Sequence, residues 1–227
     1  MNRHLLLLAI AQGLFLTNNV TFIAINGLVG LSLAPAAWMA TLPVMGYVVG
    51  GALSTGLVAK SQQRWGRQGS FQLGLLVALI SAAMGAWAVL TQSFVLLVTA
   101  TVVAGYYSAN GQLYRFAAAE LCTPDYREKA VSLVMAGGLI GAIIGPNLAI
   151  QTKSVFDVPF AGAYVALMGV ALLSMGVMRF ITFPPAPVQK ADDTGGRPLG
   201  EIMRQPVFVV AALSAALGYG VMNLLMA

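Results

Sequence analysis

Long stretches without a single charged residue constrain this chain more than any other feature of its sequence. No Asp, Glu, Lys or Arg occurs in residues 4–59, 68–114, 130–152, 158–178 and 205–227. The hydrocarbon core of a bilayer, about 30 Å thick, is crossed by roughly 20 apolar residues in a helix. The first two stretches are each long enough for two crossings and a turn, and the other three for one crossing each. The sequence therefore predicts an all-α, polytopic membrane protein with seven spans.

The composition excludes several other classes of protein. The chain is 59% hydrophobic and only 8% charged, whereas soluble domains carry about 25% charged residues. Its net charge of +5 does not indicate nucleic-acid binding, because the basic residues lie at span ends and not along a polar domain. The single cysteine, Cys122, and the single histidine, His4, form no metal-ligand cluster. We see no phosphate-binding loop and no nucleophile–base arrangement, so neither a cofactor, a metal nor an enzymatic activity is predicted.

Turn residues and basic residues predict the span boundaries and the orientation. We place the spans at residues 5–30, 37–59, 70–90, 94–119, 130–152, 159–182 and 206–227. Pro35 lies in the first connection, and Thr91 to Ser93 form another. If the amino terminus is in the cytoplasm, Lys153 is the one basic residue in the outer loops. This positive-inside bias predicts a cytoplasmic amino terminus and a multi-pass protein of the cytoplasmic (inner) membrane.

A polar, proline-rich segment separates the sixth predicted span from the seventh. We therefore predict a six-helix bundle at residues 1–182, a cytoplasmic linker at 183–205 and the first helix of a second bundle at 206–227. The last span carries no flanking charge or polar tail at Ala227. We expect the chain to be truncated or to be one part of a larger protein, completed by a missing C-terminal half or by a second copy.

Three local motifs carry a resemblance to a known family. Residues 118–130 contain an acidic residue, a proline and a following arginine at the end of the fourth span. Residues 137–146 place glycines at 137, 141 and 145 before Pro146, and residues 64–67 read Arg-Trp-Gly-Arg. Together with six spans followed by a linker, these segments resemble the major facilitator superfamily. Gln63 and Ala59 stand where the family's loop motif has an acidic residue and a glycine.

The resemblance implies the first half of a transporter plus the start of its seventh helix. The implied activity is secondary active transport of a small organic solute, in which two six-helix bundles rock about a midplane site built in this half from spans one, four and five. The alternative is a non-transporting membrane subunit or an inactive truncated half-transporter. A channel is a third reading, although no selectivity-filter motif is visible.

The first span carries a polar stripe. Gln12, Asn19 and Asn26 recur every seven residues and so follow one helix face, with Asn18 beside them. An amide that faces lipid without a partner costs several kcal/mol, so these side chains must face protein or water. They either form hydrogen bonds between helices or line the central cavity, as helix one does in the family that the chain resembles.

The fourth span is the richest in polar and aromatic residues. Tyr107, Asn110 and Tyr114 are three and four residues apart and share a helix face. Arg115 is the one charge inside a predicted span, which makes it a candidate for binding an anionic part of a solute. Alternatively, Arg115 extends to the cytoplasmic interface or pairs with Glu120.

The residues with predicted hinge or gating roles lie in the fifth span and in the loop between the second and third spans. Gly141, Gly145 and Pro146 are either a packing surface or a hinge for alternating access, and Asn147 follows them. The resemblance implies a gating role for Gly66 and Arg67. No Asp or Glu lies well inside any span. Proton coupling would therefore reside in a missing second half, or the protein would work by facilitated exchange; a sodium site built from Asn side chains and backbone carbonyls is a further alternative. Tyrosine and amide side chains suit sugars, nucleosides, vitamins and amphipathic drugs equally well, and the sequence does not choose among these solutes.

Overall fold

The computed structural model describes residues 3–184 and 199–226, and all regular structure in them is helical. The chain divides into two compact units, Met1–Ala186 and Pro187–Ala227. In the first unit, the helices are α1 (Arg3–Leu33), α2 (Leu42–Leu90), α3 (Phe94–Gly111), α4 (Tyr114–Glu120), α5 (Arg127–Thr152) and α6 (Ala161–Arg179). Two 3-10 turns, η1 (Ala37–Met39) and η2 (Pro124–Tyr126), precede α2 and α5. The second unit contains α7 (Leu199–Met203) and α8 (Pro206–Met226).

The long helical segments confirm a helical membrane bundle. Five of them are long and apolar enough to cross a bilayer: Arg3–Leu33, Ala37–Leu90, Phe94–Glu120, Pro124–Thr152 and Ala161–Arg179. Pro35 and Thr91 to Ser93 lie between helices, as the sequence predicts. Of the predicted linker, residues 185–198 lie outside the described residues, as does the end of the last span at residue 227. The division into bundle, linker and second bundle stays a prediction.

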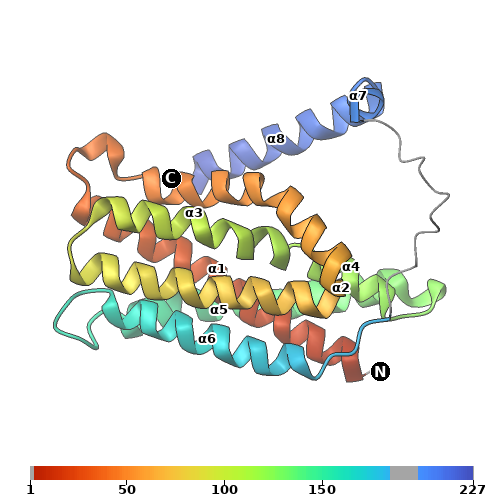
Figure 1. Ribbon diagram of the computed structural model, residues 1–227, viewed down its shortest axis with the longest axis horizontal. Coiled ribbons are helices and arrows are strands. Elements are labelled where there is room, and N and C mark those ends of the chain that lie inside the picture. The colour runs from red at the N-terminus through yellow and green to blue at the C-terminus, as the bar shows by residue number, and fades with distance from the viewer. Residues whose placement is uncertain (1–2, 185–198, 227) are drawn as a thin grey trace. The chain divides into compact units, whose positions relative to one another are not determined.

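Helix α2 doubles back on itself (Figure 1), and the one residue inside it with non-helical backbone angles is Gly66. Gly66 has a φ of 68° and a ψ of −177°, a left-handed backbone that favours glycine. The Oγ atoms of Ser61 and Ser70 are 2.6 Å apart, whereas nine residues of straight helix would span about 13 Å. The two arms of α2 therefore correspond to the second and third predicted spans. The expected loop is helical up to Gly66 and beyond it because Lys, Gln and Arg are good helix formers.

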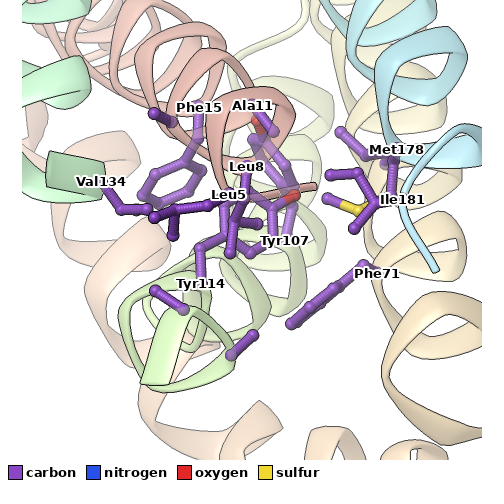
Figure 2. Close-up of a cluster of buried hydrophobic side chains, with 14 of the residues drawn as sticks. Leu5, Leu8, Ala11, Phe15, Phe71, Tyr107, Tyr114, Val134, Met178 and Ile181 are labelled. Carbon is purple, nitrogen blue, oxygen red and sulfur yellow. The ribbon is translucent and has the colours of Figure 1, made fainter. Parts of the chain in front are cut away.

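The interior of the first unit contains an aromatic cluster (Figure 2). The ring of Phe15 packs edge-on against Tyr107 and Tyr114, with centroid distances of 5.3 and 5.7 Å. Phe71 packs against Tyr114 at 4.7 Å. These contacts join α1, both segments of the fourth span and the second arm of α2, so they fix the positions of the helices that carry the polar side chains.

Apolar side chains also cover much of the outer surface. Leu53, Val95 and Ile143 are 70–75% exposed, and many other large apolar residues of α2, α3 and α5 are also exposed. Exposing such an apolar surface to water would be unfavourable, but lipid tails solvate it as well as they solvate each other. The exposure therefore agrees with helices that span a membrane.

Candidate functional site

Helices α1 and α5 form one of the closely packed pairs of the bundle. Their contact, here called the α1–α5 seam, is formed by Gly13, Thr17, Thr21, Gly141 and Gly145. A Cβ atom at Gly141 would overlap the carbonyl oxygen of Gly13, so the two backbones touch there. Thr21 Oγ1 donates a hydrogen bond of 2.8 Å to the Gly145 carbonyl. Thr17 Oγ1 lies 3.3 Å from the Gly141 carbonyl and 2.9 Å from that of Gly13. Small residues and hydroxyl groups therefore hold these two helices in direct backbone contact.

Three of the four amides predicted in the first span bond to neighbouring helices. Asn18 Nδ2 donates to the Leu167 carbonyl of α6 at 3.2 Å. Asn26 Oδ1 accepts from the hydroxyl of Tyr164, also on α6, at 2.8 Å. Asn19 Oδ1 accepts from the Tyr47 hydroxyl of α2 at 2.5 Å. These side chains act in the described structure as interhelical hydrogen-bond partners, which is one of the two readings of the polar stripe.

Two buried polar atoms of the predicted site have no hydrogen-bond partner among the described residues. They are Oε1 of Gln12 on α1 and the hydroxyl of Tyr107 on α3. The side chain of Gln12 is 5% exposed and that of Tyr107 is 2% exposed. An unpaired buried polar group costs about 1–3 kcal/mol. These two atoms are therefore available to bind a water molecule or a polar solute that reaches the interior.

The remaining predicted residues of the fourth span lie in three different environments. Asn110 is buried and donates 2.7 Å to the Ser70 carbonyl. Tyr114 is buried in the aromatic cluster of Figure 2. Arg115 is exposed on α4, and its guanidinium lies 5.0 Å from the ring centroid of Phe116. The structure therefore brings Asn110 and Tyr114 into the interior but leaves Arg115 apart from them.

Asn147 and Pro146 lie on the exposed side of α5. Asn147 Nδ2 donates to the Ile143 carbonyl of its own helix at 2.8 Å, and within residues 3–184 and 199–226 its side chain has no bond to a neighbouring helix. Gly141 and Gly145 are buried on the opposite side, in the α1–α5 seam. α5 is a single helix through Pro146 in this structure.

Two groups of bonded polar side chains lie near the turn of α2, and we call them together the Gly66 network. Tyr106 donates to Ser61 Oγ at 2.9 Å, Ser61 lies 2.6 Å from Ser70 Oγ, and Asn110 bonds to Ser70. At the turn itself, Arg67 forms a two-pronged ion pair with Glu120 of α4, with N–O distances of 2.5 and 3.1 Å. Arg67 also donates to Oε1 of Gln62. Glu120 therefore pairs with Arg67, and not with Arg115 as one reading of the sequence supposed.

The buried side chains of the candidate site could bind a solute through neutral groups. The buried groups are amides, hydroxyls and aromatic rings, and the ion pair lies at the turn. No group of three or more His, Cys, Asp or Glu residues that could hold a metal ion occurs within residues 3–184 and 199–226. Such an interior can solvate a polar or aromatic solute through hydrogen bonds and ring contacts.

Comparison with known protein families gives one decisive match. Residues 5–227 match the family model described as Major Facilitator Superfamily. The chain belongs to the major facilitator superfamily. This match confirms the resemblance drawn from the three sequence motifs, and it covers nearly the whole chain.

Curated relatives of this major facilitator chain include one with a named solute. The riboflavin transporter RfnT of Brucella anthropi is 35% identical over 228 residues, which cover 99% of this chain and 57% of the relative. Two uncharacterized MFS-type transporters of Bacillus subtilis, YddS and YdeG, are 27% and 26% identical, with 73% of this chain and 39% of each relative covered. The chain spans about half the length of the curated relatives it matches.

Several residues of this major facilitator chain that the structure connects are absent from the predicted site. Ser61 and Ser70 are missing from the predicted site, and so are Tyr47 and Tyr164, the partners of two predicted asparagines. One signal was available: Tyr106 and Asn110 are four residues apart and so share a helix face with each other. The pairing of Ser61 with Ser70 had no comparable signal, because it depends on where α2 turns.

Proposed function

We propose that this chain forms part of a secondary active transporter that moves a small organic solute across the cytoplasmic membrane by alternating access. The observation that carries the proposal is the family match over residues 5–227, together with 35% identity to a riboflavin transporter over 99% of the chain. In such carriers the solute binds near the middle of the membrane, between two bundles that rock against each other. The first unit supplies one bundle, and a C-terminal half or a second copy would supply the other.

Riboflavin is the solute that we propose to test first. Its flat ring system carries carbonyl and N–H groups, and its side chain carries hydroxyl groups. Aromatic rings and neutral hydrogen-bonding groups complement such a molecule. The unpaired Gln12 Oε1 and Tyr107 hydroxyl support this choice because each can bond to a solute without giving up an existing partner. Asn19, Asn26 and Asn110 would act beside them by exchanging their interhelical bonds.

The test is growth of a bacterial strain that can neither make riboflavin nor import it. The 227-residue chain is expressed alone and joined to the remaining, C-terminal part of the Brucella anthropi relative. Growth on low riboflavin and uptake of labelled riboflavin are measured for both. Uptake by the joined protein supports the carrier, and uptake by the chain alone supports a carrier made from two copies. If neither protein transports riboflavin or a panel of sugars, nucleosides and vitamins, the non-transporting alternative is favoured.

A matched pair of tyrosine variants tests the site separately from the fold. Tyr107→Phe removes a buried hydroxyl that has no partner among the described residues, so we expect unchanged or higher thermal stability and reduced uptake. Tyr164→Phe removes a hydroxyl that is bonded to Asn26, so we expect lower stability. Uptake that is unaffected by Tyr107→Phe would remove Tyr107 from the proposed site while leaving the carrier proposal intact.

A further inference from the structure

A cavity of about 620 Å³ lies between α1, α5 and the connection from α4 to α5. The residues that line it are Leu5, Leu121, Cys122, Thr123, Tyr126, Lys129, Ala130 and Leu133. It borders the buried core that contains the aromatic cluster: Leu5 and Ala130 belong to that core, and Leu121, Cys122 and Leu133 pack against it. None of the polar side chains described above lines it. Its size is within the range of cavities that hold small ligands, about 300–1,000 Å³.

The cavity lies at one end of the membrane-spanning helices. It is formed where α1 begins, where the span Phe94–Glu120 ends and where the span Pro124–Thr152 begins. These three ends belong to the same side of the membrane, because consecutive spans run in opposite directions. A site at this depth faces the layer in which lipid headgroups meet the upper parts of their acyl chains.

The lining is amphipathic. Its apolar residues are buried or half-buried and its polar residues are exposed, which matches the apolar chains and polar headgroup of a lipid. Leu5 and Ala130 are buried and form an apolar floor together with Leu133. Thr123 and Lys129 are exposed and supply a hydroxyl and an ammonium group. Lys129 is the one charged residue of the lining, and its Nζ lies 5.2 Å from the ring centroid of Tyr126. Asp125 and Glu128 are neighbours in the sequence but do not line the cavity.

We propose that this cavity binds an anionic phospholipid of the surrounding membrane. The phosphate is held by the Lys129 ammonium group and the Thr123 hydroxyl. The upper part of an acyl chain lies against the apolar floor. A basic side chain near a membrane surface favours anionic lipid, and the apolar floor adds a contribution that a free anion cannot use. The site is independent of the solute and of the transport proposal.

Cys122 provides a reporter for this site, because it is the only cysteine of the chain and lines the cavity. The rate at which N-ethylmaleimide modifies Cys122 is measured on the purified chain in a non-ionic detergent. Dioleoylphosphatidylglycerol is added in increasing amounts. In parallel, dioleoylglycerol tests the chains without the phosphate, and glycerol phosphate tests the headgroup without the chains. We expect the phospholipid alone to slow the modification severalfold at low concentration.

Lysine variants test whether the charge of Lys129 binds the phospholipid. Lys129→Gln should require about fivefold more phospholipid for the same protection, the ratio expected for one basic residue at a membrane surface. Lys153→Gln is the matched control, because Lys153 Nζ also lies 5.2 Å from an aromatic ring, that of Phe160, but does not line the cavity. Each rate is compared with the same variant's rate without lipid, so a direct effect of the charge on the thiol cancels.

Four results would overturn the proposal. Equal protection by dioleoylglycerol would mean that the phosphate is not recognised, and protection by glycerol phosphate alone would indicate a soluble anion. Equal shifts for Lys129→Gln and Lys153→Gln would remove Lys129 from the site. Protection by riboflavin in the absence of phospholipid protection would assign the cavity to the transported solute.

Discussion

The α1–α5 seam and the Gly66 network hold helices together in different ways. In the seam, the backbones of α1 and α5 are in contact at Gly13 and Gly141, and threonine hydroxyls bond to backbone carbonyls. In the network, side chains bond mostly to other side chains, and its outermost contact is an ion pair at the turn of α2. Backbone contact leaves no freedom for the helices to separate slightly, whereas side chains can exchange partners.

The difference indicates which part would change in the proposed transport cycle. Close-packed interfaces deform little and change between discrete arrangements, while polar side-chain contacts can be broken and remade at small cost. We therefore expect α1 and α5 to move together as one body. The Gly66 end is the place where contacts would change. This view favours the packing role of Gly141 and Gly145 over their role as a hinge.

The largest expected effect comes from adding one methyl group to the seam. Gly141→Ala places a Cβ atom onto the Gly13 carbonyl oxygen, so α1 and α5 must separate. Overpacking of this kind costs typically 1–3 kcal/mol and occasionally more, and we expect about 3 kcal/mol because the obstacle is backbone. The free energy of unfolding is measured by denaturant titration in mixed micelles.

Gly27→Ala on α1 is the matched control for that prediction. A Cβ atom at Gly27 would have no neighbour within 4 Å. The better helix propensity of alanine, up to about 1 kcal/mol, should leave this variant as stable as the parent or more stable. If both variants behave alike, the seam is not in backbone contact and the contrast with the Gly66 network fails.

For the seam, the sequence predicted the two helices but not that they pack against each other. The uncharged stretches predicted the helices because length and polarity alone decide whether a segment crosses a bilayer. The glycine spacing predicted that one face of α5 is either a packing surface or a hinge. The partner of that face was not predictable, because any helix with small residues could approach it. On α1 the contact is made by Ala9, Gly13 and Thr17.

The Gly66 network was predicted less well, for a physical reason. Lys60 to Gln68 is polar and was read as a loop, but it is helical except at Gly66. The turn brings Ser61 to Ser70 and Arg67 to Glu120, which is 53 positions away in the sequence. Such pairs depend on the direction in which two arms leave a single residue, and periodicity within each arm carries no information about that direction.

A middle-sized effect is expected from the centre of the Gly66 network. Asn110→Ala removes the bonds to the carbonyl and hydroxyl of Ser70. The hydroxyl keeps its contact with Ser61, whereas the buried carbonyl loses the bond from Asn110. A buried group that loses its partner costs about 1–3 kcal/mol, and we expect a loss near the lower end because hydrogen bonds within membranes average about 0.6 kcal/mol. The measurement is again the free energy of unfolding in mixed micelles.

Asn147→Ala is the matched control for Asn110→Ala. Asn147 is exposed and bonds only within its own helix among the described contacts, so its loss should change stability by no more than about 0.5 kcal/mol. Equal losses for the two variants would show that the buried network contributes nothing beyond the intrinsic preference of each helix for alanine.

The smallest expected effect lies at the exposed edge of the network, in the ion pair of Arg67 and Glu120. The two side chains are 23% and 40% exposed, so solvent screens their attraction, and a pair of this kind contributes at most about 1 kcal/mol. A double-mutant cycle with Arg67→Gln and Glu120→Gln measures the coupling energy. The coupling should fall toward zero in about 1 M salt, where the screening length is near 3 Å.

A cycle that combines Glu120→Gln with Arg64→Gln is the control, because Arg64 lies beside Trp65 at the same turn and should show no coupling. A salt-independent coupling of several kcal/mol would mean that the Gly66 end is as tightly fixed as the seam. The side-chain contacts there would then no longer be candidates for the part of the bundle that opens.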